Sequence, residues 1–166
     1  LFEPSYGHVD PSGVTHAFAK GARDNGAEIY RQTPVLETNQ RPDLSWDVVT
    51  PNGTIHAQRV VNAAGLWARE VAALAGIRLP LMPVEHHYFV TETIPEIEAL
   101  GFELPLIGDA DAEYYMRQEG KGLLLGVYED VCVHWAEKGT PMNFGHELLP
   151  NALERIERNL MQACEA

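Results

Sequence analysis

The sequence predicts a mixed α/β fold with a helix-containing first half and a strand-rich second half. Apolar residues recur at helical spacing in two stretches of the first half, and short strand-like runs lie between them. From residue 80 onward, prolines and aromatic residues punctuate patterns that are typical of strands. Hydrophobic residues make up 45% of the 166 positions and charged residues 22%, which indicates a protein with a packed core. We therefore expect two parts, residues 1–79 and residues 80–166.

The first predicted element is a helix that begins at Asp10-Pro11. An aspartate at the N-cap followed by proline at the first helical position is a strong start signal. The apolar positions that repeat at helical spacing are Val14, Ala17, Phe18 and Ala22. Gly26 is placed to end the helix, and residues 27–30 are expected to form a short strand.

A β-hairpin and a strand–helix pair are predicted next. Residues 45–50 alternate as a half-buried strand does, residues 51–53 form a turn signal, and residues 54–57 are the returning strand. Residues 60–65 have the pattern of a short buried strand that ends in small residues. Residues 66–75 then show helical periodicity.

The second half is predicted to be an antiparallel sheet followed by a helix. Residues 86–91 form an aromatic strand, and residues 113–118 pair with residues 123–128 through a glycine-containing turn. The last predicted element is an amphipathic helix, whose apolar stripe is Leu153, Ile156, Leu160, Met161 and Cys164.

Charge and cysteine content exclude several classes of protein. With 24 acidic against 12 basic residues the net charge is −12, so binding to nucleic acid or to an anionic membrane surface is not expected. No apolar run is long enough to suggest a membrane-spanning helix. Cys132 and Cys164 are too few for a disulfide framework and lack the spacing of a metal site, so we expect no metal and a reducing compartment.

The small residues Ala63, Ala64 and Gly65 are a candidate ligand-binding turn. Without bulky side chains, the backbone can approach a ligand closely. A helix that begins at Leu66 would direct free N–H groups toward an electron-rich group. Tight packing alone would explain the same residues.

Two adjacent pairs of ring side chains are candidates for chemistry. Neighbouring residues of a strand face opposite sides, so only one of His86 and His87, and only one of Tyr114 and Tyr115, is expected to face any single site. Packing is the usual role of such rings. The sequence contains neither a G-x-G-x-x-G fingerprint nor a G-x-S-x-G elbow.

Five segments together resemble one enzyme family: residues 7–11, residues 60–68, residues 83–88, residues 114–119 with 122–126, and residues 135–148. They are similar to segments of the FAD-dependent amine dehydrogenases related to dimethylglycine and sarcosine dehydrogenases, within the D-amino-acid-oxidase-like flavoproteins. The similarity covers essentially the whole chain in the expected order. The fifth segment resembles the dimethylglycine dehydrogenase branch in particular.

The resemblance implies a fold, a reaction and a set of site residues. Residues 1–79 would be part of a Rossmann-like FAD-binding domain, and residues 80–166 part of an antiparallel substrate-domain sheet. The implied reaction is hydride transfer from the N-methyl group of a small amino acid to FAD, with the carbon released as formaldehyde or passed to tetrahydrofolate. The implied substrate-side residues are His86 and Tyr114, and the implied cofactor-side residues are Val35, Ala63, Ala64, Gly65 and Trp67.

The family's pyrophosphate loop, its acidic ribose ligand and its flavin-linked histidine would all precede residue 1, and its folate-binding domain would follow residue 166. We therefore expect a central fragment that is inactive by itself, because the pyrophosphate loop supplies most phosphate contacts. The expected partner is a small N-methyl amino acid, in a bacterial cytoplasm or a mitochondrial matrix, and the oligomeric state is left open. Two alternatives remain: another amine or amino-acid oxidase of the same class, or a non-catalytic binding module.

Overall fold

The computed structural model describes residues 7–145 and 147–165, which divide into two compact units. The four-stranded unit contains residues 84–133 and 148–165 with the short segment 7–11, and the three-stranded unit contains residues 12–83, 134–145 and 147. The predicted mixed α/β fold is confirmed, while the proposed division at residues 79 and 80 stays a prediction. Within the described residues, no helix combines the length and apolar character needed to cross a bilayer.

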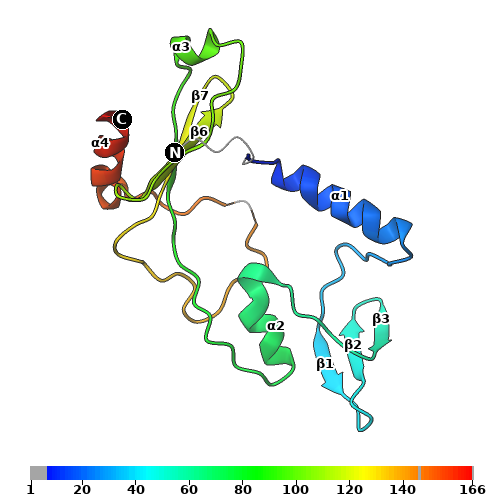
Figure 1. Ribbon diagram of the computed structural model, residues 1–166. Helices are drawn as coiled ribbons and strands as arrows, with labels where there is room; N and C mark the ends of the chain where they lie inside the picture. The colour runs from blue at the N-terminus through cyan, green and yellow to red at the C-terminus, as the bar shows by residue number, and fades with distance from the viewer. Residues whose placement is uncertain (1–6, 146, 166) are drawn as a thin grey trace. The chain divides into compact units, whose positions relative to one another are not determined.

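The three-stranded unit is built on an antiparallel sheet with the order β1-β2-β3 (Figure 1). Its strands are β1 (Glu37–Gln40), β2 (Trp46–Thr50) and β3 (Gly53–Ala57). The predicted hairpin is confirmed, with Thr50 opposite Gly53 at the turn. Gly53 has φ +129°, a conformation that favours glycine, so the turn depends on this residue.

The predicted first helix is confirmed as α1 (Pro11–Asp24). Gly26 ends it with φ +88°, and the Ala27 N–H donates to the Ala22 carbonyl at 3.0 Å. None of its residues is buried, and Phe18 is 77% exposed. The helix therefore forms from local signals, without a core contact to the described residues.

The strand predicted at residues 27–30 is wrong. This segment pairs with no strand of the described chain, and its apolar side chains Ile29 and Tyr30 are exposed. Its backbone leaves α1 through the glycine turn and enters another turn at once. A strand needs a neighbouring strand to pair its N–H and C=O groups, and in the described part of the chain no strand pairs with this segment.

The strand predicted at residues 60–65 is also wrong. The Asn62 side chain accepts the Ala64 N–H at 3.1 Å and donates to the Ala68 carbonyl at 2.8 Å. An asparagine that bonds nearby backbone groups in this way folds the chain into a turn. Val61 is 86% exposed, so the expected burial is absent too. The following helix is confirmed as a single 3-10 turn, η1 (Gly65–Trp67), continued by α2 (Ala68–Leu74).

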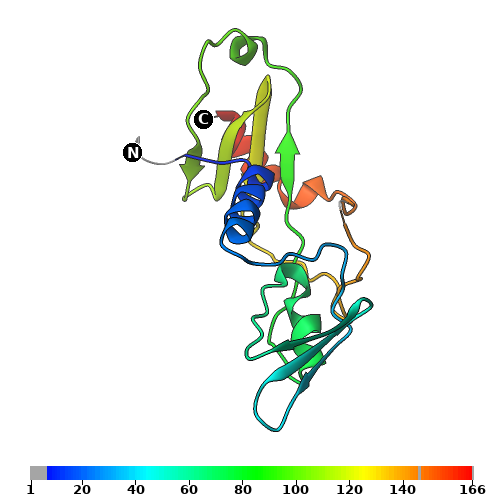
Figure 2. The same ribbon diagram turned by 90° about the vertical axis from the view of Figure 1, so that its right-hand side faces the viewer.

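The four-stranded unit is an antiparallel sheet with the order β4-β7-β6-β5 and one helix packed on it (Figure 2). Its strands are β4 (Tyr88–Val90), β5 (Ile107–Asp109), β6 (Tyr114–Glu119) and β7 (Gly122–Val127), and its helices are α3 (Pro95–Glu98), η2 (Leu153–Arg155) and α4 (Glu157–Glu165). The predicted pairing of the two central strands is confirmed, since Tyr114 lies opposite Val127 and Glu119 opposite Gly122.

The core of this unit lies between α4 and one face of the sheet. Its buried apolar members are Ala112, Tyr114, Leu125, Val127 and Ile156, with Met116, Leu160 and Ala163 packed against them. The buried Asn159 anchors the helix, because its side-chain amide donates to the Ala112 carbonyl at 2.8 Å.

The apolar stripe predicted for the last helix is only partly right. Ile156 and Leu160 face the core, but Leu153, Met161 and Cys164 are exposed. The helical turn breaks between η2 and α4, which changes the phase of the stripe. Both cysteines are free and exposed.

We predict that Ile156→Ala lowers the free energy of unfolding of the four-stranded unit by about 2–5 kcal/mol, because it leaves a cavity where a fully buried side chain stood. Urea denaturation of the full-length gene product, followed by circular dichroism, measures this loss. The control is Met161→Ala on α4, where the side chain is 59% exposed and a change within about 0.5 kcal/mol is expected. Equal losses in both variants would contradict this account of the core.

Candidate functional site

The face of the four-stranded sheet that is turned away from α4 carries a cluster of rings. Tyr115 follows the buried Tyr114 and Tyr128 follows the buried Val127, so strand alternation directs both tyrosines to this second face. We call it the aromatic face. The rings of Tyr115 and Tyr128 lie 5.9 Å apart at 52°, and those of His86 and Tyr128 lie 5.8 Å apart at 42°. Such tilted contacts are favourable for aromatic pairs.

Gly126 makes room for this cluster. It lies opposite Tyr115 in the ladder, and a Cβ atom at this position would meet the tyrosine ring at 2.1 to 2.3 Å. The Tyr115 ring therefore crosses directly over the backbone of β7. A larger residue at position 126 would push the ring away from Tyr128.

The structure brings His86 together with Tyr115 and Tyr128, but not with Tyr114. Tyr114 is only 2% exposed and packs under α4, on the opposite face of the sheet. The expectation that one tyrosine of the pair enters the core is met, but which one does so depends on where the helix packs. The catalytic roles assigned to His86 and Tyr114 stay predictions. Sequence patterns missed Tyr128, although its place one residue after Val127 in the alternating strand was a usable signal.

The strand predicted at residues 86–91 is shorter than expected, since β4 begins only at Tyr88. The reason is that the backbone N–H of His87 donates to the Glu129 carboxylate at 3.1 Å and not to a neighbouring strand. His87 Nδ1 and Glu129 Oε1 are 2.6 Å apart. His87 therefore belongs to an internal contact, while His86 lies on the aromatic face.

Glu129 is also held by Arg155 of the same unit. The Arg155 guanidinium donates both to Glu129 and to Glu85, the latter at 2.5 Å, and the Glu129 side chain is only 5% exposed. Burial raises the pKa of Glu129, but the hydrogen bonds from His87 and the charge of Arg155 outweigh it and hold the pKa below its usual value. We call His87, Glu129, Arg155 and Glu85 the ionic network.

The residues predicted to lie near a cofactor are in the three-stranded unit. Ala63 and Gly65 are exposed, and Val35 and Ala64 are half-buried. Gly65 has φ +53°, and nothing lies within 4 Å of where its Cβ would be. The backbone here is thus open to close approach by a ligand, as the small residues suggested. That they contact FAD stays a prediction.

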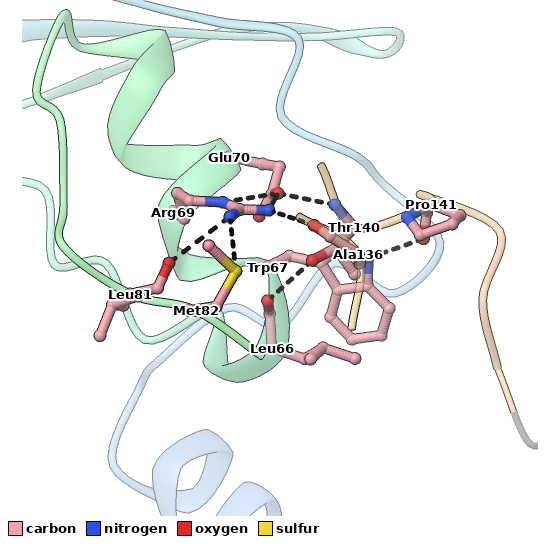
Figure 3. Close-up of polar contacts among 9 residues, drawn as sticks. All are labelled: Leu66, Trp67, Arg69, Glu70, Leu81, Met82, Ala136, Thr140 and Pro141. Atoms are coloured by element: carbon pink, nitrogen blue, oxygen red, sulfur yellow. Dashed lines mark hydrogen bonds and ion pairs between the residues drawn. The ribbon is translucent and has the colours of Figure 1, made fainter. Parts of the chain in front are cut away.

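Trp67 belongs to a set of contacts that ties residues 136–141 to η1 and α2 (Figure 3). Its indole N–H donates to the Pro141 carbonyl at 3.0 Å. The Arg69 guanidinium donates to the Ala136 carbonyl at 2.8 Å, and the Thr140 N–H donates to Glu70 at 2.7 Å. This backbone hydrogen bond, with help from Arg69, holds the pKa of Glu70 below its usual value although burial opposes the shift. Trp67 and Arg69 therefore have structural contacts that account for their presence.

Within the described residues, no three His, Cys, Asp or Glu side chains are arranged to hold a metal ion. The Arg117 guanidinium donates to the Gln118 carbonyl at 3.0 Å and pairs with Glu119 at 2.6 Å, so these neighbouring groups already engage it. The aromatic face is thus the part of the four-stranded unit where side chains of functional interest gather.

We predict that Gly126→Ala destabilises the protein by about 1–3 kcal/mol and displaces the Tyr115 ring, because the new methyl group would overlap it. The matched control is Gly108→Ala: Gly108 also lies opposite Tyr115, on the other neighbouring strand, and a Cβ there would meet nothing within 4 Å. Thermal unfolding and a crystal structure of each variant measure the effect. Equal destabilisation by both substitutions would refute the ring position described above.

We predict that Glu129 makes stability depend on acid pH. Because its pKa is lowered in the folded state, its stabilising contribution is present above the ordinary carboxyl pKa of about 4.3 and is lost as the pH falls through the lower folded value. Below about pH 5, Glu129→Gln should therefore show a shallower loss of stability than the unsubstituted protein. Urea midpoints between about pH 3 and pH 7 measure this, with the exposed Glu157→Gln as control. Parallel pH profiles for all three proteins would contradict the prediction.

Comparison with known proteins finds relatives among the dimethylglycine and sarcosine dehydrogenases. The chain is 47% identical over 170 residues to mitochondrial dimethylglycine dehydrogenase of Mus musculus, covering 99% of this chain and 20% of that protein. It is 34% identical over 150 residues to mitochondrial sarcosine dehydrogenase of Homo sapiens, covering 87% of this chain and 16% of that protein. The chain thus spans about a fifth of the length of these relatives.

The crystal structure of L-proline dehydrogenase from P. horikoshii shares the fold, with a TM-score of 0.69 and 24% identity over 95% of this chain and 39% of that one. The family model described as DAO, FAD dependent oxidoreductase, matches residues 1–166. The resemblance stated from the sequence is therefore confirmed, and the chain belongs to the FAD-dependent oxidoreductase family.

Proposed function

We propose that this chain is part of a flavoenzyme that oxidises the N-methyl group of dimethylglycine or sarcosine by hydride transfer to FAD. The observation that carries this proposal is the 47% identity to dimethylglycine dehydrogenase over 99% of the chain. The substrate is a small N-methyl amino acid. Consistent with the relatives' names, we place the protein in the mitochondrial matrix if its source is a eukaryote, and in the cytoplasm if it is bacterial.

The aromatic face suits an N-methylated ammonium ion. Electron-rich ring faces attract methylated ammonium groups, and Tyr115 and Tyr128 present two such rings beside one imidazole. Tyr128 is 59% exposed and His86 is exposed, so both are accessible to a small molecule. Their ring contacts hold them as one surface before the substrate arrives.

The cofactor-side residues fit FAD in one respect. The open space beside Gly65 and the small side chains before it would let a flat or phosphate-bearing group approach the backbone. We assign Val35, Ala63, Ala64 and Gly65 to this side, and Trp67 to the support of the turn, because its indole N–H is engaged by Pro141. When bound, FAD would supply the hydride acceptor.

His86 has the chemistry to prepare the substrate. Hydride loss from an N-methyl carbon needs a neutral amine, whose lone pair assists the transfer. Histidine changes its charge near neutral pH, so His86 can take the proton from the substrate ammonium. Tyr115 and Tyr128 then hold the amine in place. Tyr114, which packs under α4, would support the sheet from behind.

The product carbon leaves as formaldehyde or passes to tetrahydrofolate. We assign no folate contact to residues 1–166 and propose that any such site is formed elsewhere in the full-length protein. The isolated 166 residues are proposed to be inactive. Dye reduction by this chain alone with dimethylglycine and added FAD would contradict that part of the proposal.

We predict that His86→Ala in the full-length gene product lowers turnover of dimethylglycine or sarcosine about a hundredfold or more, because the proton acceptor is lost. Flavin absorbance should stay unchanged. The control is His16→Ala on the exposed surface of α1, which should keep full turnover.

Two outcomes would overturn the proposal. A folded full-length protein without flavin absorbance would indicate a binding module. A His86→Ala variant with unchanged turnover on these substrates would remove this histidine from the mechanism. Relative kcat/KM values for dimethylglycine, sarcosine and glycine would separate the proposed activity from that of another amine oxidase.

A further inference from the structure

The ionic network lies directly behind the aromatic face. His86 and Tyr128 meet on the aromatic face, and their sequence neighbours His87 and Glu129 meet on the core side. The contact of His87 with Glu129 therefore joins the same two chain segments that bring His86 to Tyr128. Tyr88 and Gly126 form the last ladder pair before this point.

Hydrogen bonds define the state of His87. The Ala152 N–H donates to His87 Nε2 at 3.3 Å, so Nε2 must be an unprotonated acceptor. Nδ1 therefore carries the hydrogen and donates it to Glu129. With its backbone N–H also bonded to Glu129, His87 is held at three points.

At His87, contacts with the Glu129 side chain take the place of backbone pairing between strands. Since β4 begins only at Tyr88, the position of His86 depends on the bonds of its neighbour His87. Glu129 is in turn anchored to Arg155, which lies at the end of η2 and also holds Glu85. The residue before His86 and the residue after it are thus both tied to the same arginine-centred network.

Resting on the function proposed above, we propose that His87 and Glu129 are positioning residues, which act on the substrate through His86 by holding its imidazole against Tyr128. They do not touch the substrate, because both lie on the core side with side chains that are 12% and 5% exposed. A buried ion-pair network is by itself weak support for stability, because desolvation opposes the attraction between the charges. A role in placing His86 accounts for the location of the ionic network directly behind the aromatic face.

The test is a double-mutant cycle on the flavin-loaded full-length gene product. His87→Ala should lower kcat for dimethylglycine about tenfold by releasing His86. In the His86→Ala background, the same substitution should have almost no further effect, because the residue that it positions is already gone. His87→Asn, whose side-chain amide can still donate to Glu129, should restore most of kcat.

Controls separate positioning from general destabilisation. Arg158→Ala removes the exposed pair with Asp130 at 3.4 Å on α4 and should leave kcat unchanged. Flavin absorbance and thermal unfolding are measured for every variant. If His87→Ala gives no folded protein, Glu129→Gln takes its place in the cycle.

The outcomes are distinguishable. If the losses from His86→Ala and His87→Ala simply multiply, or if His87→Asn is as slow as His87→Ala, the positioning role is refuted while the proposed function stands. If His86→Ala alone keeps full turnover, the proposed function of His86 fails first, and the positioning role fails with it.

Discussion

The alternation of side chains along β6 and β7 is the constraint on which the rest of this site depends. Each residue that enters the core beneath α4 forces its neighbour onto the aromatic face. Tyr114 and Val127 are buried, so Tyr115 and Tyr128 are directed to the opposite side. A one-residue slip of the register would exchange the two sets and bury polar groups in the core. The same packing that stabilises the sheet therefore selects its functional side chains.

Local signals explain which elements could be predicted from the sequence. The start of α1 and both hairpins have caps, turns or alternating residues that act within a few positions. β1 has the sequence Glu37–Gln40, entirely polar, and forms a strand only because β2 pairs with it. Residues 60–65 have an apolar strand pattern, but Asn62 bonds to the nearby backbone and makes a turn. Strand pairing, which no short window contains, decides the first case, whereas a competing local side-chain bond decides the second.

The sequence predicts which types of side chain form the candidate site, but it does not predict which face of the sheet each of them lies on. Sequence patterns indicated that only one histidine and one tyrosine of each adjacent pair could share a site. Choosing between Tyr114 and Tyr115 needs the side on which α4 packs, a contact between residues more than 40 positions apart in the chain, such as Asn159 with Ala112. The catalytic roles of His86 and Tyr114 remain predictions, whereas the contact between the rings of His86 and Tyr128 is observed in the structure.

The segment that carries His86 is held by side-chain hydrogen bonds and not by pairing with a neighbouring strand. A ladder bond at His87 would fix the backbone but would leave that segment independent of the last helix. The Glu129 carboxylate accepts bonds from both His87 and Arg155, so the segment that leads into α4 is connected to the segment that carries His86. Charge-assisted bonds of this kind are shorter and more directional than neutral ones. Displacement of Arg155 would therefore be transmitted to His86 through the carboxylates of Glu129 and Glu85, which makes the geometry of the aromatic face sensitive to the packing of the C-terminal segment.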